Sequence, residues 1–542
     1  MPDFDPLVYR YASRRNVVYA RNAVACTSVP LGAQIGLDVM KSGGNAVDAA
    51  VAMAAAMPLL EPTGNGLGSD CFALVWIARD KKLYGLNASG AAPMALSAEK
   101  VRAMGYAEMP KTGWLPTMVP GAPAGWAALS RRFGTKPLAE LFAPAISYAE
   151  AGYPVPVNVA LQWERDSRRI ARAMAENAAP HEYWWKYFMK PGGTPYRAGE
   201  VFRLPDYAAT LRSLAATDCE SYYRGELMEK IVAFSRAAGG WFCEDDFRNY
   251  RPEWVEPITQ DYRGYTVCEI PPNGHGITVL MALGILDGMI MPDKRESAEH
   301  YHKVMEAIKL AFADTKTYVA DPRYMKTRVS ELLDPAYLAA RRALITDRAL
   351  EPKAGDPHCG GTIYLCTADR EGNMVSFIQS NYTTFGAGVA VPGTGISLQN
   401  RGANFSLDPA SDNCLAGGKK SYHTIIPGFL LKDGEAVGPF GVMGAFMQPQ
   451  GQVEVIINTL DYHMNPQEAL DAPRIQWIGG KKLQLEREAG EEIAAALRAM
   501  GHEVEVIEDR IGMGRGQIIW RTENGVYAAG TEPRCDGTAA AW

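Results

Sequence analysis

Thr362 lies where its side chain can attack the peptide bond that precedes it. It follows Gly360 and Gly361 and begins a run rich in β-branched and aromatic residues, 363–368. A glycine pair lets the chain bend sharply, which would bring the Thr362 hydroxyl to its own preceding carbonyl group. A break there would make Thr362 a new N-terminus, with the hydroxyl as nucleophile and the freed α-amine as its base. Taken alone, the pattern describes an ordinary strand start equally well.

The elements around Thr362 are predicted to be a loop followed by a β-hairpin. Residues 351–359 contain two prolines, one glycine and no apolar pattern, which is typical of a loop. Residues 363–368 and 374–380 are predicted to be paired strands because both have strand-like composition or alternation. Residues 370–373, Arg-Glu-Gly-Asn, supply the turn between them.

Two helices and a glycine-rich loop are predicted near the start of the chain. Residues 33–41 and 45–57 have helical patterns separated by Gly43-Gly44, and the second is nearly all small or apolar, so we expect it to be buried. Residues 61–70 form a glycine-rich loop before a predicted strand at 71–78. This loop lacks the context and the Gly-Lys-Ser/Thr ending of a phosphate-binding loop. We therefore expect it to let the backbone approach a ligand or a neighbouring strand.

The rest of the chain alternates helices and strands, which predicts a layered α/β fold. Helical patterns occur at residues 206–215, 225–238, 297–319 and 491–500, a helix or strand begins at Val453, and strands occur at 425–431, 436–442, 504–507 and 517–520. His300 and His302 are two residues apart, a spacing that does not aim both at one metal ion, so we expect them on the surface or in the core. Trp184, Trp185 and Tyr187 are expected to form a wall or a lid.

The composition is that of a globular protein without a block of basic residues. The 542 residues include 55 Lys and Arg against 61 Asp and Glu, a net charge of −6, so nucleic-acid binding gets no support. The nine cysteines include no Cys-x-x-Cys pair, which argues against a disulfide framework or a structural zinc site. Residues 1–6 show neither the basic region nor the apolar region of a secretory signal, so none is expected, and no apolar run is long enough to cross a membrane. We therefore expect a cytoplasmic protein.

Several short motifs, in one order along nearly the whole chain, resemble the γ-glutamyltranspeptidase family of N-terminal-nucleophile (Ntn) hydrolases. Each motif is weak by itself, whereas their shared order is specific. The motifs are residues 43–52 (GGNAVDAAVA), Glu61-Pro62 with its glycine-rich loop, the Thr362 hairpin, residues 385–388 (FGAG), residues 395–400 (GISLQN) and residues 530–534 (GTEPR).

The resemblance implies a precursor that cleaves itself before Thr362. A large segment, residues 1–361, and a small segment, residues 362–542, would remain packed together in a four-layer αββα sandwich. The product is a heterodimer that acts on a small-molecule amide and needs no cofactor or metal. Whether such heterodimers pair further stays open.

The resemblance also implies roles for individual residues. Thr362 is the nucleophile, Ser380 orients it, and the backbone N–H groups of Gly444 and Ala445 form the oxyanion hole. A glycine-rich turn can aim two N–H groups at one developing charge. Without the family, Gly444-Ala445 would be interpreted as an ordinary strand turn.

The sequence departs from the family at the residues that hold the acyl group. The transpeptidases bind the glutamyl α-carboxylate with an arginine and a Ser-Ser pair, and those positions hold Ser89 and His423-Thr424 here. They bind the α-amine with an acidic residue that is Asn404 here, while a nearby Gln or Glu position holds Arg401. An asparagine cannot pair with an ammonium as a carboxylate does. Arg401 instead indicates an acyl group with a free carboxylate and no cation beside it; a solvated Arg401 and a pocket-wall His423 remain alternatives.

The residues support two classes of function. One is an Ntn hydrolase that passes a γ-glutamyl or similar carboxylated acyl group to water or an amine. With a rebuilt pocket, it would be a small-amide amidohydrolase of the oxamate type, or a cephalosporin or glutaryl acylase. The other class is a non-catalytic relative that binds a small metabolite. A Ser-His-Asp hydrolase is disfavoured because the chain has no Gly-x-Ser-x-Gly motif.

Overall fold

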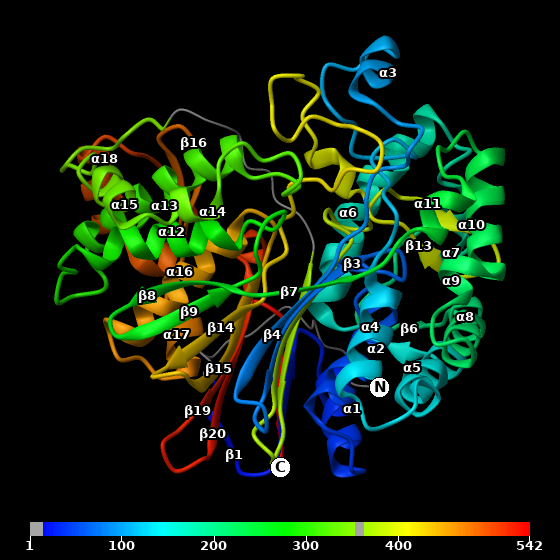
Figure 1. The fold of residues 1–542 in the computed structure, drawn as a ribbon, viewed down its shortest axis with the longest axis horizontal. Helices are drawn as coiled ribbons and strands as arrows, with labels where there is room; N and C mark the ends of the chain where they lie inside the picture. Colours follow the sequence, from blue (N-terminus) through cyan, green and yellow to red (C-terminus); the bar gives the residue numbers. More distant parts are fainter. Residues whose placement is uncertain (1–14, 353–361) are drawn as a thin grey trace.

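Two seven-stranded antiparallel sheets packed face to face form the centre of the protein (Figure 1). The computed structural model describes residues 15–352 and 362–542. In the first, sheet A, the strand order is β1 (Val18–Ala20), β20 (Tyr527–Thr531), β19 (Arg515–Arg521), β15 (Glu435–Met443), β14 (Gly428–Lys432), β9 (Tyr265–Glu269) and β8 (Ile258–Tyr262). In the second, sheet B, the order is β21 (Thr538–Ala541), β2 (Val24–Thr27), β10 (Ile363–Ala368), β11 (Met374–Ser380), β3 (Asp70–Ile77), β4 (Lys82–Ala88) and β7 (Glu253–Val255).

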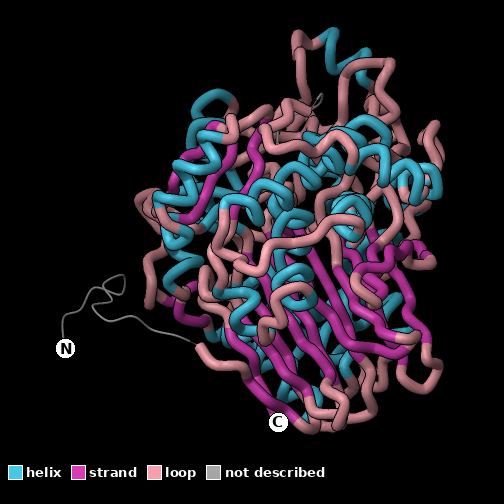
Figure 2. Tube along the Cα trace, turned by 90° about the vertical axis from the view of Figure 1, so that its left-hand side faces the viewer, coloured by secondary structure: helices cyan, strands magenta, loops and turns pink. Residues whose placement is uncertain are grey.

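Helices cover the outer face of each sheet and complete four layers, so the predicted αββα sandwich is confirmed (Figures 1 and 2). The helices on the side of sheet B are α1 (Pro30–Lys41), α2 (Ala46–Leu60), α4 (Ala122–Phe133), α5 (Leu138–Ala151) and α8 (Pro205–Ala216). Those on the side of sheet A are α12 (Gly276–Asp287), α13 (Ala298–Tyr318), α16 (Met447–Leu460) and α17 (Pro466–Asp471).

Smaller elements surround the sandwich. The short strands are β5 (Tyr153–Pro154) with β6 (Val201–Phe202), β12 (Ala390–Val391) with β13 (Ile396–Ser397), and β16 (Ile475–Gly479) with β17 (Lys482–Glu486) and β18 (Glu503–Ile507). The other α-helices are α3 (Ala98–Ala103), α6 (Val157–Glu176), α7 (Glu182–Phe188), α9 (Ser221–Arg224), α10 (Glu226–Ala237), α11 (Glu244–Arg248), α14 (Val329–Leu332), α15 (Pro335–Arg342) and α18 (Glu491–Ala499). Within the described part of the chain, no helix is both long and apolar enough to span a membrane.

Both sheets combine strands from before and after residue 362. In sheet B, β10 pairs with β2, β11 pairs with β3, and β21 pairs with β2. In sheet A, β14 pairs with β9 and β20 pairs with β1. The parts of the chain on the two sides of residue 362 therefore share two sheets, and separating them would break backbone ladders in both.

The local patterns near the start of the chain produce the expected helices. The Asn45 side chain accepts hydrogen bonds from the backbone N–H groups of Val47 and Asp48, and the Asp48 side chain accepts one from Asn45 N–H. This reciprocal cap satisfies N–H groups that a helix start leaves unpaired. Every residue of α2 is buried, as its small and apolar composition predicts. The helix continues through Pro58 to Leu60, three residues further than predicted.

The glycine-rich loop brings backbone against the start of β10. A Cβ atom at Gly64 would lie 3.0 Å from the carbonyl oxygen of Thr362, and one at Gly68 would lie 2.3 Å from the carbonyl oxygen of Ser397. Gly68 also forms a parallel bridge with Leu398. The loop thus serves close backbone packing, as the sequence indicates, and side chains at Gly64 or Gly68 would disrupt it.

The other predicted elements are found close to their expected limits. The four later helices correspond to α8, α10, α13 and α18, and the strands predicted at 425–431 and 436–442 correspond to β14 and β15. The segment from Val453 is helical and belongs to α16, which begins at Met447. Four cysteines in strands, Cys26, Cys71, Cys268 and Cys366, are buried and form no disulfide among the described residues. Residues 353–361, with Cys359, Gly360 and Gly361, lie outside the described residues.

A buried ammonium group connects α13 to the segment that precedes residue 353. Lys309 Nζ donates to Glu306 Oε1 at 2.7 Å, to the Leu350 carbonyl oxygen at 3.2 Å and to His502 Nδ1 at 3.3 Å. These bonds use all three ammonium protons. Glu306 Oε2 accepts the Leu350 N–H at 2.9 Å. The Lys309 and Glu306 side chains are fully buried, and burial lowers the pKa of Lys309.

His302 and His502 extend this network. His300 and His302, which were expected either on the surface or in the core, are both buried. His302 Nε2 donates to the Thr346 carbonyl oxygen at 2.7 Å, so its Nδ1 accepts from His502 Nε2 at 2.8 Å. His300 is also buried, with Nδ1 3.0 Å from Tyr462 Oη. One ligand atom each from His302, Glu306 and His502 lies within 4.8 Å of the others, a spacing that suits a metal ion. The Lys309 ammonium is bonded to two of these three groups, so it supplies the positive charge there.

We expect Lys309→Met to destabilise the fold strongly. The substitution leaves the Glu306 carboxylate buried without its cation, which costs about 3–5 kcal/mol in comparable buried pairs. The measurement is the midpoint of urea unfolding. The matched control is Lys186→Met, which breaks a solvent-exposed pair with Glu182 and should leave the midpoint nearly unchanged. Equal midpoints for the two variants would contradict a structural role for the network.

We also expect the fold to survive a break between residues 352 and 362. A specific protease site inserted there, once cut, should leave one particle in size-exclusion chromatography, because strand ladders in both sheets cross the break. The two pieces should separate only under denaturing conditions. Separate elution of the pieces in native buffer would show that the shared sheets do not hold them. The uncut protein serves as the size standard.

Candidate active site

Thr362 and Ser380 face each other at the open end of the β10–β11 hairpin. The antiparallel register pairs Ile363 with Gln379, and one position further Thr362 Oγ lies 3.0 Å from Ser380 Oγ. Both side chains are buried, and Ser380 Oγ accepts the backbone N–H of Tyr382 at 2.8 Å. The sheet therefore holds the predicted nucleophile against the hydroxyl predicted to orient it.

Gln448 is a further contact of the predicted nucleophile, and sequence reasoning missed it. Its Nε2 donates to Thr362 Oγ at 3.4 Å, and its Oε1 accepts the backbone N–H of Ile426 at 3.1 Å. Gln448 lies in the first turn of α16, three residues after Ala445. The one signal in the sequence was this short separation from the predicted oxyanion turn.

Gly444 and Ala445 form a tight turn between β15 and α16. Their φ angles are +141° and +51°, and the left-handed conformation of Ala445 is costly for a residue with a Cβ atom. Neither backbone N–H donates a hydrogen bond to another described residue. The turn precedes the N-terminus of α16, where the helix dipole favours negative charge. Two unused donors beside a helix start suit a developing oxyanion.

Arg401 is a fully buried cation with unused hydrogen-bonding capacity. It begins a 3₁₀ turn, Arg401–Asn404, and none of its surface is exposed. Its Nη1 donates to Thr424 Oγ at 2.5 Å, whereas Nε and Nη2 have no hydrogen-bond partner among the described residues. Burial lowers the Arg401 pKa to about 10, so the group remains charged at neutral pH. A buried guanidinium with two unused donors is suited to a carboxylate. The structure therefore excludes the solvated alternative.

Tyr382 contacts both Ser380 and Arg401. Its ring centroid lies 4.7 Å from the Arg401 guanidinium carbon, and its backbone N–H bonds to Ser380. The backbone of Tyr382 has φ +77°, a strained conformation for a bulky residue. Such strain is retained where the surrounding structure requires it, and here it turns the chain from the end of β11 toward the Arg401 pocket.

His423 is neutral and faces a buried acid, Asp70, that sequence reasoning did not select. His423 Nδ1 accepts the Ile425 N–H at 3.4 Å, so its Nε2 carries the proton and donates to Asp70 Oδ2 at 3.0 Å. Burial holds the His423 pKa well below its usual value. Burial also raises the Asp70 pKa, to about 7, although the Arg401 charge opposes that shift. The predicted pair His423-Thr424 thus contacts both an acid and Arg401.

The side chains of Ser89 and Asn404, which were predicted to hold the acyl group, make no hydrogen bond to Arg401 among the described residues. Ser89 Oγ donates to Asn87 Oδ1 at 2.7 Å and lies 3.4 Å from Asn273 Oδ1, and among the described residues it has no hydrogen bond to Arg401. Asn404 lines a cleft of about 410 Å³ together with Tyr382 and Phe446, and its Nδ2 has no partner among the described residues. Asn404 therefore faces an open cleft, whereas Ser89 is buried among its hydrogen-bond partners.

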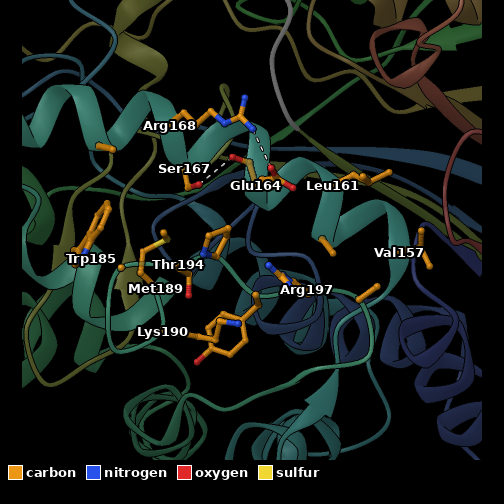
Figure 3. A pocket seen from close by; sticks show the side chains of 16 residues that line it. Val157, Leu161, Glu164, Ser167, Arg168, Trp185, Met189, Lys190, Thr194 and Arg197 are labelled. Carbon is orange, nitrogen blue, oxygen red and sulfur yellow. Dashed lines mark hydrogen bonds and ion pairs between the residues drawn. The ribbon is translucent and has the colours of Figure 1, made fainter. Parts of the chain in front are cut away.

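Two larger cavities adjoin the sandwich. One, of about 740 Å³, includes Thr383 and Gly444 in its lining and so extends to the predicted oxyanion turn. The other, of about 650 Å³, lies between α6 and the segment that follows α7, with Trp185 and Met189 in its wall (Figure 3). Trp184 is buried, with its ring centroid 4.9 Å from that of Phe385. Of the predicted aromatic wall, Trp185 alone lines this cavity, and the cavity contains none of the predicted catalytic residues.

Comparison with known proteins relates the whole chain to one family. The model of the gamma-glutamyltranspeptidase family matches residues 32–542. A glutathione hydrolase-like proenzyme of Bacillus subtilis is 34% identical, over 94% of this chain and 96% of the relative. The oxamate amidohydrolase proenzyme of Klebsiella pneumoniae is also 34% identical, over 94% of this chain and 97% of the relative. Among solved structures, a cephalosporin acylase from Bacillus halodurans aligns with a TM-score of 0.96 and 53% identity, covering 100% of this chain and 99% of that one.

Proposed function

The chain belongs to the γ-glutamyltranspeptidase family of Ntn hydrolases, and from that premise we propose that it cleaves itself before Thr362 and then hydrolyses amides whose acyl half ends in a carboxylate. Residues 1–361 and 362–542 would be the two subunits of the mature enzyme. The interleaved strands of sheets A and B support a mature heterodimer that stays together after the cut.

Self-cleavage begins with attack of Thr362 Oγ on the preceding carbonyl carbon. The amide nitrogen of Thr362 takes the Oγ proton and leaves as the free α-amine, and the acyl group of the large segment is carried on Oγ as an ester. Water hydrolyses this ester, which restores the Thr362 hydroxyl and leaves a carboxylate at the end of the large segment. The hydrogen bonds that Thr362 Oγ makes to Ser380 and Gln448 orient the attacking oxygen.

Amide hydrolysis reuses the same oxygen with the new α-amine as base. The α-amine takes the Thr362 Oγ proton as Oγ attacks the substrate carbonyl, and it then protonates the departing amine. The N–H groups of Gly444 and Ala445 stabilise the oxyanion, an interaction for which loss of one donor costs about 3–4 kcal/mol in other hydrolases. Water, activated by the α-amine, releases the acyl group and restores Thr362.

The proposed acyl group rests on one observation, which is that Arg401 is buried and has two donors without a partner among the described residues. A buried guanidinium with two unused donors is stabilised by a substrate carboxylate, because an unpaired charge in the interior is costly. Asn404 offers no negative charge to an ammonium, which argues against a γ-glutamyl group as the preferred acyl half. Oxamate, named for the Klebsiella relative, combines an amide with a carboxylate and carries no ammonium.

We expect Thr362→Ala to remain a single chain without amidase activity. Alanine has no hydroxyl to attack the preceding carbonyl, so neither the cut nor the acyl-enzyme can form. Denaturing electrophoresis with N-terminal sequencing of the small piece checks the cut, and release of p-nitroaniline checks activity. Thr362→Ser is the matched control and should retain both. A cleaved, active Thr362→Ala protein, or a small piece that begins at another residue, would overturn the mechanism.

We expect glutaryl-p-nitroanilide to be a better substrate than γ-glutamyl-p-nitroanilide. The two differ only by the α-ammonium group, so the ratio of their kcat/KM values isolates that charge, and we expect a ratio of about tenfold or more. Asn404→Asp should shift the ratio toward the γ-glutamyl substrate, with Asn404→Ala as the neutral control. Equal or better use of the γ-glutamyl substrate by the wild type, lost in Asn404→Ala, would contradict the charge argument.

A further inference from the structure

Asp70 is a buried carboxylate enclosed by protein hydrogen bonds. Its Oδ1 accepts the backbone N–H groups of Gly90 and Gly121, both at 3.2 Å, and its Oδ2 accepts the His423 Nε2 proton at 3.0 Å. Gln399 Nε2 lies 3.5 Å from the same Oδ2. None of the Asp70 surface is exposed, and it is absent from the lining of the cleft that contains Asn404. Asp70 therefore has no free face with which to contact a substrate.

Two short routes nevertheless connect Asp70 to Arg401. On one side, Gln399 donates to Asp70, and Gln399 Oε1 accepts the backbone N–H of Arg401. On the other side, His423 donates to Asp70, and the next residue, Thr424, accepts from Arg401 Nη1 at 2.5 Å. No atoms of Asp70 and Arg401 come within ion-pair distance of each other in the described structure, so the two charges interact through the interior rather than by direct contact.

We propose that Asp70 is a positioning and specificity-determining residue. It holds Arg401 in place through Gln399 and through His423-Thr424, and it sets how strongly the acyl pocket attracts a carboxylate. This inference rests on the proposed function, because it concerns the acyl half of the substrate described there. With Asp70 ionised, its charge partly compensates Arg401. With Asp70 protonated, the Arg401 charge acts on the substrate uncompensated.

Among the described ionisable groups that interact with Asp70 or His423, only Asp70 changes its charge near neutral pH. The other ionisable groups that interact with Asp70 or with its partner His423 are Arg401, Lys420, Cys71, Tyr222, Tyr250 and His275. Burial raises the pKa of the cysteine and both tyrosines and lowers that of His423 and His275, so all five are neutral at pH 7. Burial raises the Asp70 pKa to about 7.

The sign of the effect follows from these charges. Below pH 7 Asp70 is protonated, and Arg401 attracts a carboxylate without competition. Above pH 7 Asp70 is ionised, and the same carboxylate is held less tightly. The acyl carboxylate of the substrate is itself ionised throughout this range, because an ordinary carboxyl group titrates near pH 4. KM for a carboxylated substrate should therefore rise as pH increases from 6 to 8.5.

The test compares glutaryl-p-nitroanilide with its methyl ester, which has the same shape near the reacting carbonyl but no charge. The readout is the ratio of the ester KM to the acid KM between pH 5.5 and 8.5. Titration of the Thr362 α-amine affects both substrates and cancels in this ratio. For the wild type we expect the ratio to fall roughly five- to tenfold as pH rises. For Asp70→Asn, which removes the charge at nearly constant shape, we expect a ratio that does not vary with pH.

Each outcome either supports or overturns the proposed role of Asp70. A wild-type ratio that stays constant with pH overturns the inference even if Asp70→Asn fails to fold. A pH-dependent ratio that persists unchanged in folded Asp70→Asn assigns the titration to another group and also overturns it. In both cases the proposed function stands, provided that the acid substrate is hydrolysed in a Thr362-dependent manner. If neither substrate is hydrolysed, the proposed function fails first and the inference fails with it.

Discussion

The antiparallel pairing of β10 with β11 is the constraint on which the site depends. It sets Thr362 opposite Ser380 at a hydroxyl separation of 3.0 Å, and neither residue is placed by a loop alone. The hairpin lies inside sheet B, bounded by β2 and β3, so both strands are held on their outer edges as well. A one-residue slip in this register would turn every side chain of the hairpin to the opposite face. The register therefore sets where Thr362, the predicted nucleophile, lies relative to Ser380.

The second constraint is the burial of Arg401. A cation in the interior costs free energy unless it is paired, and Thr424, the Tyr382 ring and the distant Asp70 charge supply only part of the compensation. The remaining donors are where a substrate carboxylate is most useful. The proposed specificity would thus come from a charge that the described residues satisfy only in part, and the proposed catalysis would use hydroxyl and backbone groups on the hairpin and at the start of α16.

The architecture also explains how a chain cut before Thr362 can remain a single particle. Strands from both sides of that position share both sheets, and the glycine-rich loop at residues 61–70 packs its backbone on Thr362 and Ser397. Upstream, the Lys309 network binds the Leu350 backbone to α13. The described chain is therefore held by hydrogen bonds at Leu350 on one side of residues 353–361 and by sheet B from Ile363 on the other.

Local pattern predicted many elements of this protein, because helix and strand periodicity and capping act over a few residues. The Thr362 hairpin, α1, α2 and the strands β14 and β15 all lie close to their predicted limits. The sequence also predicted which residues could form the site. The order of the motifs identified the hydroxyls and the glycine turn, and Arg401 was noted because it departs from the family pattern. Only the tertiary structure decided which of them meet. Asp70 contacts a residue 353 positions away, Gln448 one 86 away, and His302 pairs with His502 rather than with His300. Such contacts depend on how sheets and helices pack, and no local spacing encodes them.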